Sequence, residues 1–342
     1  MTSPAPPTPS ALKTPASLLA RAVRTNPPLA LTTLLTAVVL LVCLVGLVAD
    51  PRQVLGEPTW LKPTKFAVSI CVYSLTLVWF LTYVRGRRRL VVTVSWIVAA
   101  ALLVELALIV LQSARGLRSH FNVSTPLDQT VYFTMAGAIA TLWATNVVLA
   151  VVLLAQRLDD PVLAWGLRGG LVVAVVGMAV AFLMTDPTPT QLEALRAGGD
   201  RVLIGAHTVG PADGGPGLPL LGWSTVAGDL RAAHFIGIHA MQALPLVAWL
   251  VAVVPAGRLT VRDRTRLVQV AGCAALAVVL LLAWQALRGQ PLTGPDTLTL
   301  AVAAAIALGT LTAAATVVLT ARRRTPPSEP ARQSPTPGAH LD

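Results

Sequence analysis

The segment Pro28-Leu-Ala-Leu-Thr-Thr-Leu-Leu-Thr-Ala-Val-Val-Leu-Leu-Val-Cys-Leu-Val-Gly-Leu-Val-Ala49 decides the fold. It carries no charged residue. As a helix it is long enough to cross the hydrocarbon core of a bilayer, which takes about 20 apolar residues. The apolar run is too long for a signal peptide, and no small-x-small cleavage site follows it. We therefore expect residues 28–49 to form a transmembrane helix.

Seven further segments of the same character follow, so the sequence predicts an all-α fold: a polytopic transmembrane helical bundle of about eight spans. The chain is 55% hydrophobic and only 12% charged, whereas soluble domains carry about 25% charged residues. We expect the bundle to occupy residues 27–320, between disordered Pro-rich cytoplasmic tails at 1–26 and 321–342. The eight predicted spans are 28–49, 66–84, 90–112, 131–155, 162–184, 233–254, 266–286 and 295–320.

Arginine clusters predict the orientation of the bundle. Short loops on the cytoplasmic side of a membrane are enriched in Lys and Arg. Arg-rich stretches at 85–89, 258–266 and 322–324 all fall on the side that also receives the N-terminus. We therefore expect a multi-pass protein of a bacterial inner membrane with both termini in the cytoplasm.

The formal net charge of +11 has the same explanation. The basic residues lie beside apolar segments, and no aromatic-basic platform for nucleic acid accompanies them. We expect contact with anionic lipid headgroups and no nucleic-acid partner. Cys43, Cys71 and Cys273 lie inside apolar segments without Cys-x-x-Cys spacing, which favours free thiols over disulfides.

The connection before the sixth span, roughly residues 185–232, lies on the predicted outer side. It is rich in Gly, Pro, Trp and His, and connections of this length are usually functional or disordered. We expect it to fold over the mouth of the bundle, with a flexible flap as the alternative. Asp229 is placed to cap the sixth span, with Arg231 in its first turn.

Glu105 is a candidate functional residue, because a carboxylate inside an apolar span is costly unless it is paired. Polar residues of neighbouring spans lie at comparable depth, which indicates an outward-facing polar pocket. Ordinary contacts are the alternative: snorkelling for the lysines and interhelical hydrogen bonds for most of the others. The candidate ligand-binding residues are Lys62, Lys65, Ser69, Tyr73, Glu105, Asp229, Arg231, His234, His239 and Gln242.

Four histidines map to the predicted outer side: His120, His207, His234 and His239. Haem iron takes axial His ligands from facing elements, so two of these on different segments could bind haem b. His234 and His239 point about 140° apart on a helix and cannot ligate one metal as an i, i+4 pair does. The sequence shows no Ser-His-Asp or His-Glu-x-x-His motif for hydrolysis.

Gly166 and Gly170 form a small-xxx-small pair in the fifth predicted span. Such pairs let two helix backbones approach closely, so we expect a tight helix contact there. Pro245 within the sixth span predicts a kink, since proline removes a helix hydrogen bond.

Several strings resemble those of an uncharacterised family of bacterial polytopic membrane proteins. They are Lys62-Pro-Thr-Lys-Phe66, Gly205-Ala-His-Thr-Val-Gly210, Asp213-Gly-Gly-Pro-Gly217 and Gly228-Asp-Leu-Arg231 with His234 and His239. The resemblance covers residues 28–320 and implies the same membrane architecture. It implies no activity, cofactor or catalytic residue.

Three kinds of function fit these observations. The first is transport or binding of a small solute in the outward-facing pocket, where intramembrane ionisable residues commonly mark the path. The second is a membrane redox protein that binds haem or a quinone near the outer face. The third is a non-catalytic sensor or assembly factor whose long loop meets a partner.

Overall fold

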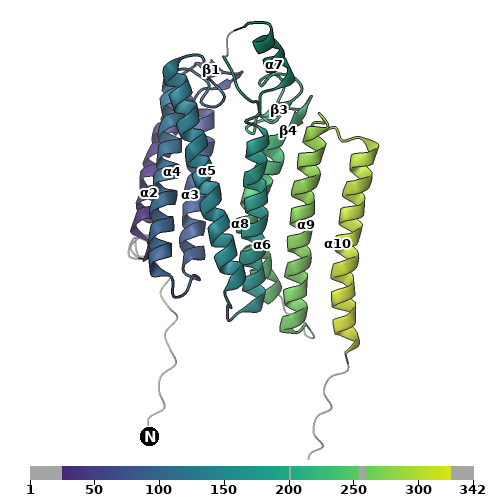
Figure 1. The fold of residues 1–342 in the computed structure, drawn as a ribbon. Helices are drawn as coiled ribbons and strands as arrows, with labels where there is room; N and C mark the ends of the chain where they lie inside the picture. Colours follow the sequence, from purple (N-terminus) through teal and green to yellow (C-terminus); the bar gives the residue numbers. More distant parts are fainter. Residues whose placement is uncertain (1–24, 200–201, 254–258, 325–342) are drawn as a thin grey trace, which may run out of the picture.

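The computed structural model describes residues 25–199, 202–253 and 259–324, which form a helical bundle (Figure 1). Within this part of the chain, eight helices are long and apolar enough to cross a membrane. The predicted all-α, multi-pass membrane architecture is therefore confirmed. The eight are α2 (Pro27–Ala49), α3 (Leu61–Leu81), α4 (Arg88–Ala114), α5 (Pro126–Ala155), α6 (Pro161–Leu183), α8 (Leu230–Val253), α9 (Val261–Leu287) and α10 (Thr297–Arg323).

The helix boundaries follow local sequence signals. Asn26, Thr125 and Asp160 each accept a backbone N–H at the start of a helix, and each is followed directly by proline. Proline suits this position because the first helical N–H groups have no intrahelical partner. Three spans, α3, α5 and α9, begin five residues earlier than expected. The predicted bounds missed the caps Thr125 of α5 and Thr260 of α9, whereas no side chain caps the start of α3. The predicted tails lie almost wholly outside the described residues, and α10 continues to Arg323.

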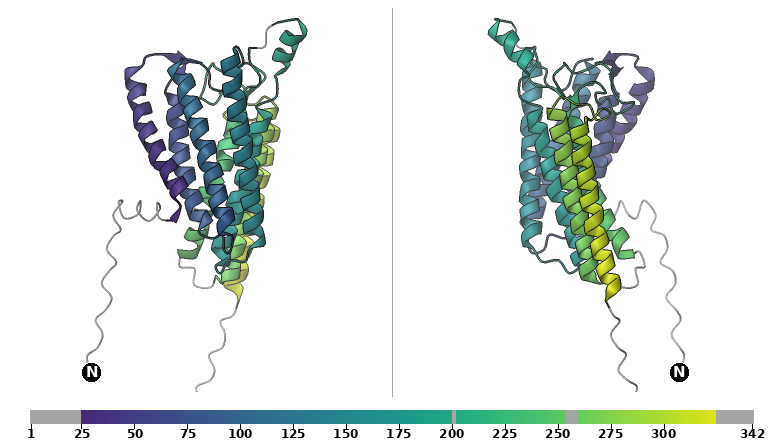
Figure 2. Two further views of the ribbon diagram at one scale, coloured as in Figure 1. Left: turned by 60° about the vertical axis from the view of Figure 1, so that its left-hand side comes forward. Right: turned by 90° about the vertical axis from the view of Figure 1, so that its right-hand side faces the viewer.

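The helices form two groups (Figure 1). The helices α2, α3, α4 and α5 contact one another, α6, α8 and α9 do the same, and α5 packs against α6 to join the groups. The last helix, α10, lies at the edge of the bundle against α9 (Figure 2). Because the chain crosses an even number of times, residues 25 and 324 lie at one end, which we call the tail end (Figure 1).

A stripe of glycines brings α6 and α8 together, as the small-xxx-small pair predicts. A Cβ added at Gly170 would lie 2.8 Å from the Ala240 carbonyl oxygen, and one at Gly177 would lie 2.6 Å from Cα of Gly237. Real Cβ atoms do not approach that closely, so glycine is required for this contact. The stripe therefore fixes how α8 sits on α6.

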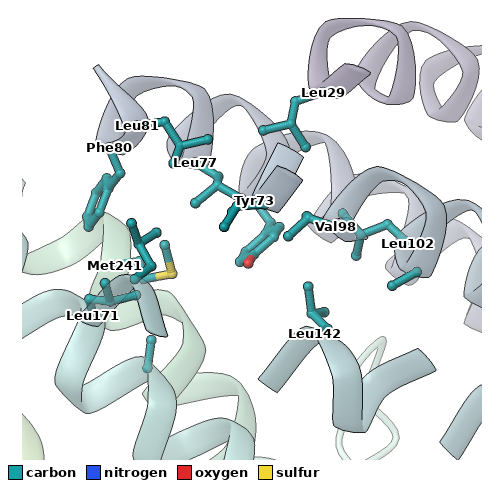
Figure 3. Packing of buried hydrophobic residues seen from close by; sticks show 14 of the residues in the cluster. Leu29, Tyr73, Leu77, Phe80, Leu81, Val98, Leu102, Leu142, Leu171 and Met241 are labelled. Carbon is teal, nitrogen blue, oxygen red and sulfur yellow. The ribbon is translucent and has the colours of Figure 1, made fainter. Parts of the chain in front are cut away.

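The largest apolar cluster joins the two groups of helices. Leu77 and Phe80 of α3 lie beside Met241 of α8 and Leu171 of α6 (Figure 3). All four side chains are almost fully buried. This contact places α3 next to α8. Residues of both helices line the groove described below.

The connection between α6 and α8, residues 184–229, covers the end opposite the tail end; we call it the covering loop and that end the loop end (Figure 1). It contains α7 (Pro189–Arg196), β3 (Thr208–Val209) and β4 (Gly228–Asp229). Its backbone is bonded at two places: Ala206 N–H donates to Met184 O, directly after α6, and Ile204 N–H donates to Phe121 O in the connection between α4 and α5. A second hairpin, β1 (Gln53–Val54) with β2 (Glu57–Pro58), links α2 to α3 at the same end.

Candidate functional site at the loop end

The loop end holds a chain of three ionisable side chains from three segments. Lys62 begins α3, His120 lies between α4 and α5, and Glu105 lies in α4. The Lys62 Nζ is 3.1 Å from Nδ1 of His120, and Nε2 of the same ring is 3.3 Å from Oε1 of Glu105. Lysine has no acceptor, so it donates and Nδ1 accepts. The other ring nitrogen, Nε2, therefore carries the proton in the neutral imidazole and faces the carboxylate.

Glu105 has unmet hydrogen-bonding capacity. Its side chain is 2% exposed, and the contact with His120 does not have hydrogen-bond geometry. Neither carboxylate oxygen has a hydrogen-bond partner among the residues that the structure describes. Glu105 lies nine residues before the end of α4, about 14 Å along the helix.

A second buried pair lies in the covering loop. Nδ1 of His207 donates to Oδ2 of Asp213 at 2.6 Å, and Oδ1 of Asp213 accepts the backbone N–H groups of His207 and Thr208. Burial lowers the pKa of His207 to about 4. Burial alone would raise the pKa of Asp213, but the hydrogen bonds from His207 and Thr208 outweigh it and hold this pKa below its usual range. At neutral pH the pair is a neutral imidazole bonded to a carboxylate.

The ring of His120 lies close to the His207–Asp213 pair and so links this pair to the Lys62–His120–Glu105 chain. Its centroid is 6.5 Å from that of His207, and Phe121 contacts both imidazoles. Burial, and then the charge of Lys62, lower the pKa of His120, while Glu105 opposes the shift. A hollow of ≈ 290 Å³ lies between α7 and the rest of the covering loop, and Asp213 lines it.

Two cations, each also in an ion pair, bond carbonyl oxygens of the covering loop. The guanidinium of Arg231 bonds both carboxylate oxygens of Asp229 and the Gly222 carbonyl oxygen. Asp229 also accepts the N–H of Arg231 in the first turn of α8, as predicted for a capping residue. The Lys65 Nζ bonds Glu57 of β2 and the carbonyl oxygen of Leu221. Lys65, Asp229 and Arg231 therefore anchor the covering loop.

Tyr73 and Ser69 of α3 lie deeper than Lys62. Tyr73 is buried, and its hydroxyl bonds the side-chain amide of Asn146 in α5. This is an interhelical hydrogen bond of the kind expected between membrane helices. Ser69 is half-buried. The structure brings neither residue into contact with the Lys62–His120–Glu105 chain.

The histidines of α8 point to different sides, as their 140° separation predicts. His234 donates from Nδ1 to the Gly177 carbonyl oxygen at 2.9 Å and so faces α6. His239 is exposed and lies 3.3 Å from the amide oxygen of Gln242, whose nitrogen bonds Thr76 of α3. The expected meeting of His239 with Glu105 in one pocket does not occur.

Sequence reasoning missed several of these partners. Asp213 stands six residues after His207 among turn-forming glycines, and the pairing of an acidic residue with a nearby loop histidine was a usable signal. Asn146, a polar amide inside an apolar span, was another. Nothing in the sequence marked Thr76. Within the described residues, no group of three or more His, Cys, Asp or Glu side chains could hold a metal ion.

No protein family, curated protein or solved structure matches this chain. The membrane architecture therefore stands on the eight helices alone, and the resemblance to bacterial polytopic proteins of unknown activity gains no support. Any function must be argued from the residues themselves.

Proposed function

We propose that the protein binds a small polar solute at Glu105, as the binding site of a transporter or of a solute-binding membrane protein. The observation that carries this proposal is the pair of buried, unbonded carboxylate oxygens of Glu105. A buried acceptor without a partner costs about 1–3 kcal/mol, and more when it is charged. A solute with hydrogen-bond donor groups would remove that cost on binding.

The surrounding charges favour a polar solute over an apolar one. His120 faces Glu105 on one side and is bonded by Lys62 on the other. A bound donor group would form the hydrogen bond to Glu105 that His120, 3.3 Å away, does not form. Lys62, at the start of α3, could then pair with an acidic group of the same solute.

The distribution of arginines supports an outward-facing site. The stretch at 85–89 and the residues 322–324 lie at the tail end, opposite the covering loop. If the tail end is cytoplasmic, as the positive-inside rule predicts, the loop end faces outward. We therefore propose that the solute arrives from outside the cell and that both termini are cytoplasmic.

The test is uptake by liposomes that contain the purified protein, with radiolabelled amino acids, amines and sugars as a panel. We expect at least one solute to accumulate, and Glu105→Gln to reduce that accumulation at least tenfold because the amide replaces an acceptor oxygen with a donor. Glu193→Gln, at an exposed glutamate of α7, is the matched control and should leave uptake unchanged. Equal uptake by wild type and Glu105→Gln would refute the proposal.

A second candidate, a haem-binding redox protein, is favoured by the histidine contacts. His207 and His234 each donate from Nδ1, to Asp213 and to the Gly177 carbonyl oxygen. In this tautomer Nε2 is unprotonated, which is the usual form of a metal-binding imidazole. A Soret band in protein from haem-supplied cells, lost in His207→Ala or His234→Ala but kept in His239→Ala, would support this candidate. Purified protein without a Soret band would contradict the haem-binding candidate.

A further inference from the structure

A separate polar group lies on the side of the bundle between α3 and α8. It consists of Thr76, Gln242 and His239, and none of these residues contacts the site at the loop end. His239 lies nine residues into α8, about 14 Å along the helix. At that depth an exposed side chain meets the hydrocarbon core of the bilayer, where an unbonded polar atom is costly.

The hydrogen bonds of this group run in one direction. The hydroxyl of Thr76 donates to the Val72 carbonyl oxygen at 2.7 Å, and a carbonyl only accepts. Thr76 Oγ1 must therefore accept from the Gln242 amide nitrogen, 3.0 Å away. This orients the Gln242 oxygen toward His239, so Nδ1 of His239 donates to it at 3.3 Å. The neutral ring then has an unprotonated Nε2, which is an acceptor.

Two residues of this group, Thr76 and Gln242, line a mostly apolar groove of ≈ 450 Å³. His239 does not line the groove but contacts Gln242 at its edge. Thr76 and Gln242 line it together with Met241, Leu246 and two tryptophans, Trp79 from α3 and Trp249 from α8, and Asp160 at the start of α6 also lines it. Trp79 is 39% exposed and Trp249 is 57% exposed. Gln242, Leu246 and Trp249 follow one face of α8, at spacings of four and three residues.

We propose that this groove binds a quinol, with a phenolic hydroxyl donating to Nε2 of His239. The unprotonated Nε2 of His239 can accept a hydrogen bond from the hydroxyl group of a lipid-soluble ligand. The indole of Trp79, three residues after Thr76 on α3, suits a flat aromatic ring. The apolar wall down to Trp249, about 15 Å along α8 from His239, suits a prenyl tail. The oxidised quinone presents only carbonyl acceptors to His239 and is the weaker ligand. This inference does not rest on the solute site at Glu105, because the two sites share no residue.

The experiment measures thermal unfolding of the purified protein in detergent, under anaerobic conditions, with increasing decylubiquinol, decylubiquinone or farnesol. A ligand that binds only the folded state raises the midpoint in proportion to its affinity. We expect decylubiquinol to stabilise the protein at lower concentrations than decylubiquinone or farnesol. His239→Leu should raise the apparent Kd for decylubiquinol about tenfold, the effect of one hydrogen bond lost at a dry site.

The control is a tryptophan of matched exposure. Trp249→Phe should weaken quinol binding, whereas Trp96→Phe, at a 59% exposed residue of α4, should not. His239 is exposed, so its substitution by Leu does not disturb the core. No stabilisation by decylubiquinol, equal stabilisation by farnesol, or an unchanged Kd in His239→Leu would each overturn the proposal.

Discussion

His207 and Asp213 hold the covering loop together through one short bond. The neutral imidazole donates to the carboxylate at 2.6 Å, and the backbone N–H groups of His207 and Thr208 bond the second oxygen. Burial disfavours the charged imidazole, which is why its pKa falls to about 4. The pKa of the neighbouring His120 is shifted in the same direction.

These pKa shifts predict that acid loosens the covering loop. In the open loop His207 regains its ordinary pKa near 6.5 and takes up a proton that the closed loop excludes. The stabilisation is therefore fully present above about pH 6.5 and is lost as the pH falls toward 4. Hydrogen exchange of residues 203–213, corrected for intrinsic rates, should accelerate by up to about two orders of magnitude across this window.

The variant His207→Gln is the control, since glutamine does not titrate. Its corrected exchange should be faster than wild type at pH 7 and should change little down to pH 5. A wild-type loop whose corrected exchange is constant between pH 7 and pH 4.5 would contradict the assigned protonation state.

At the scale of elements, the contact between α6 and α8 places His234 and the start of the covering loop. The backbones approach so closely at Gly177 and Gly237 that no side chain fits between them. The carbonyl oxygen of Gly177 also accepts the hydrogen bond from His234. Gly177 therefore allows the close packing of α6 against α8 and also orients His234, a candidate haem ligand.

The variant Gly177→Ala should destabilise the protein by about 1–3 kcal/mol, as overpacking of a filled contact does. The readout is the midpoint of thermal unfolding in detergent. Gly137→Ala is the matched control, because a Cβ at Gly137 in α5 meets no atom within 4 Å. That change should be neutral or slightly stabilising, since alanine favours helix over glycine. A Gly177→Ala protein as stable as wild type would show that α6 and α8 do not pack as described.

At the scale of the molecule, the two ends of the bundle should lie on opposite sides of the membrane. Thr190, on α7, is exposed at the loop end, and Arg157 is exposed at the tail end. In a variant without the three native cysteines, an impermeant maleimide added to intact cells should label Thr190→Cys at once. It should label Arg157→Cys only after permeabilisation. The reverse pattern would invert the orientation, and labelling of both would contradict the span count.

Much of the architecture could be predicted from sequence because a membrane span needs a long apolar segment wherever it occurs. Glu105 was also visible, since charge is rare in such segments, and Lys62 was visible as a lysine on the predicted outer side, just before the second predicted span. Their meeting at His120 was not, because it depends on the path of a loop that has no periodicity. The direction in which His239 points depends on the rotation of α8, which the glycine contact with α6 fixes only in three dimensions.

The order of residues in the chain has a consequence for synthesis. Lys62, Glu105 and His120 belong to the first part of the chain, whereas the covering loop and α8 follow α6. A growing polypeptide therefore delivers the buried carboxylate to the bilayer with His120 close behind it, well before anything covers the pair. The Lys62–His120–Glu105 chain is enclosed only after α8 has been synthesised and Gly237 packs against α6. We therefore expect the loop end to close late in the synthesis of each molecule.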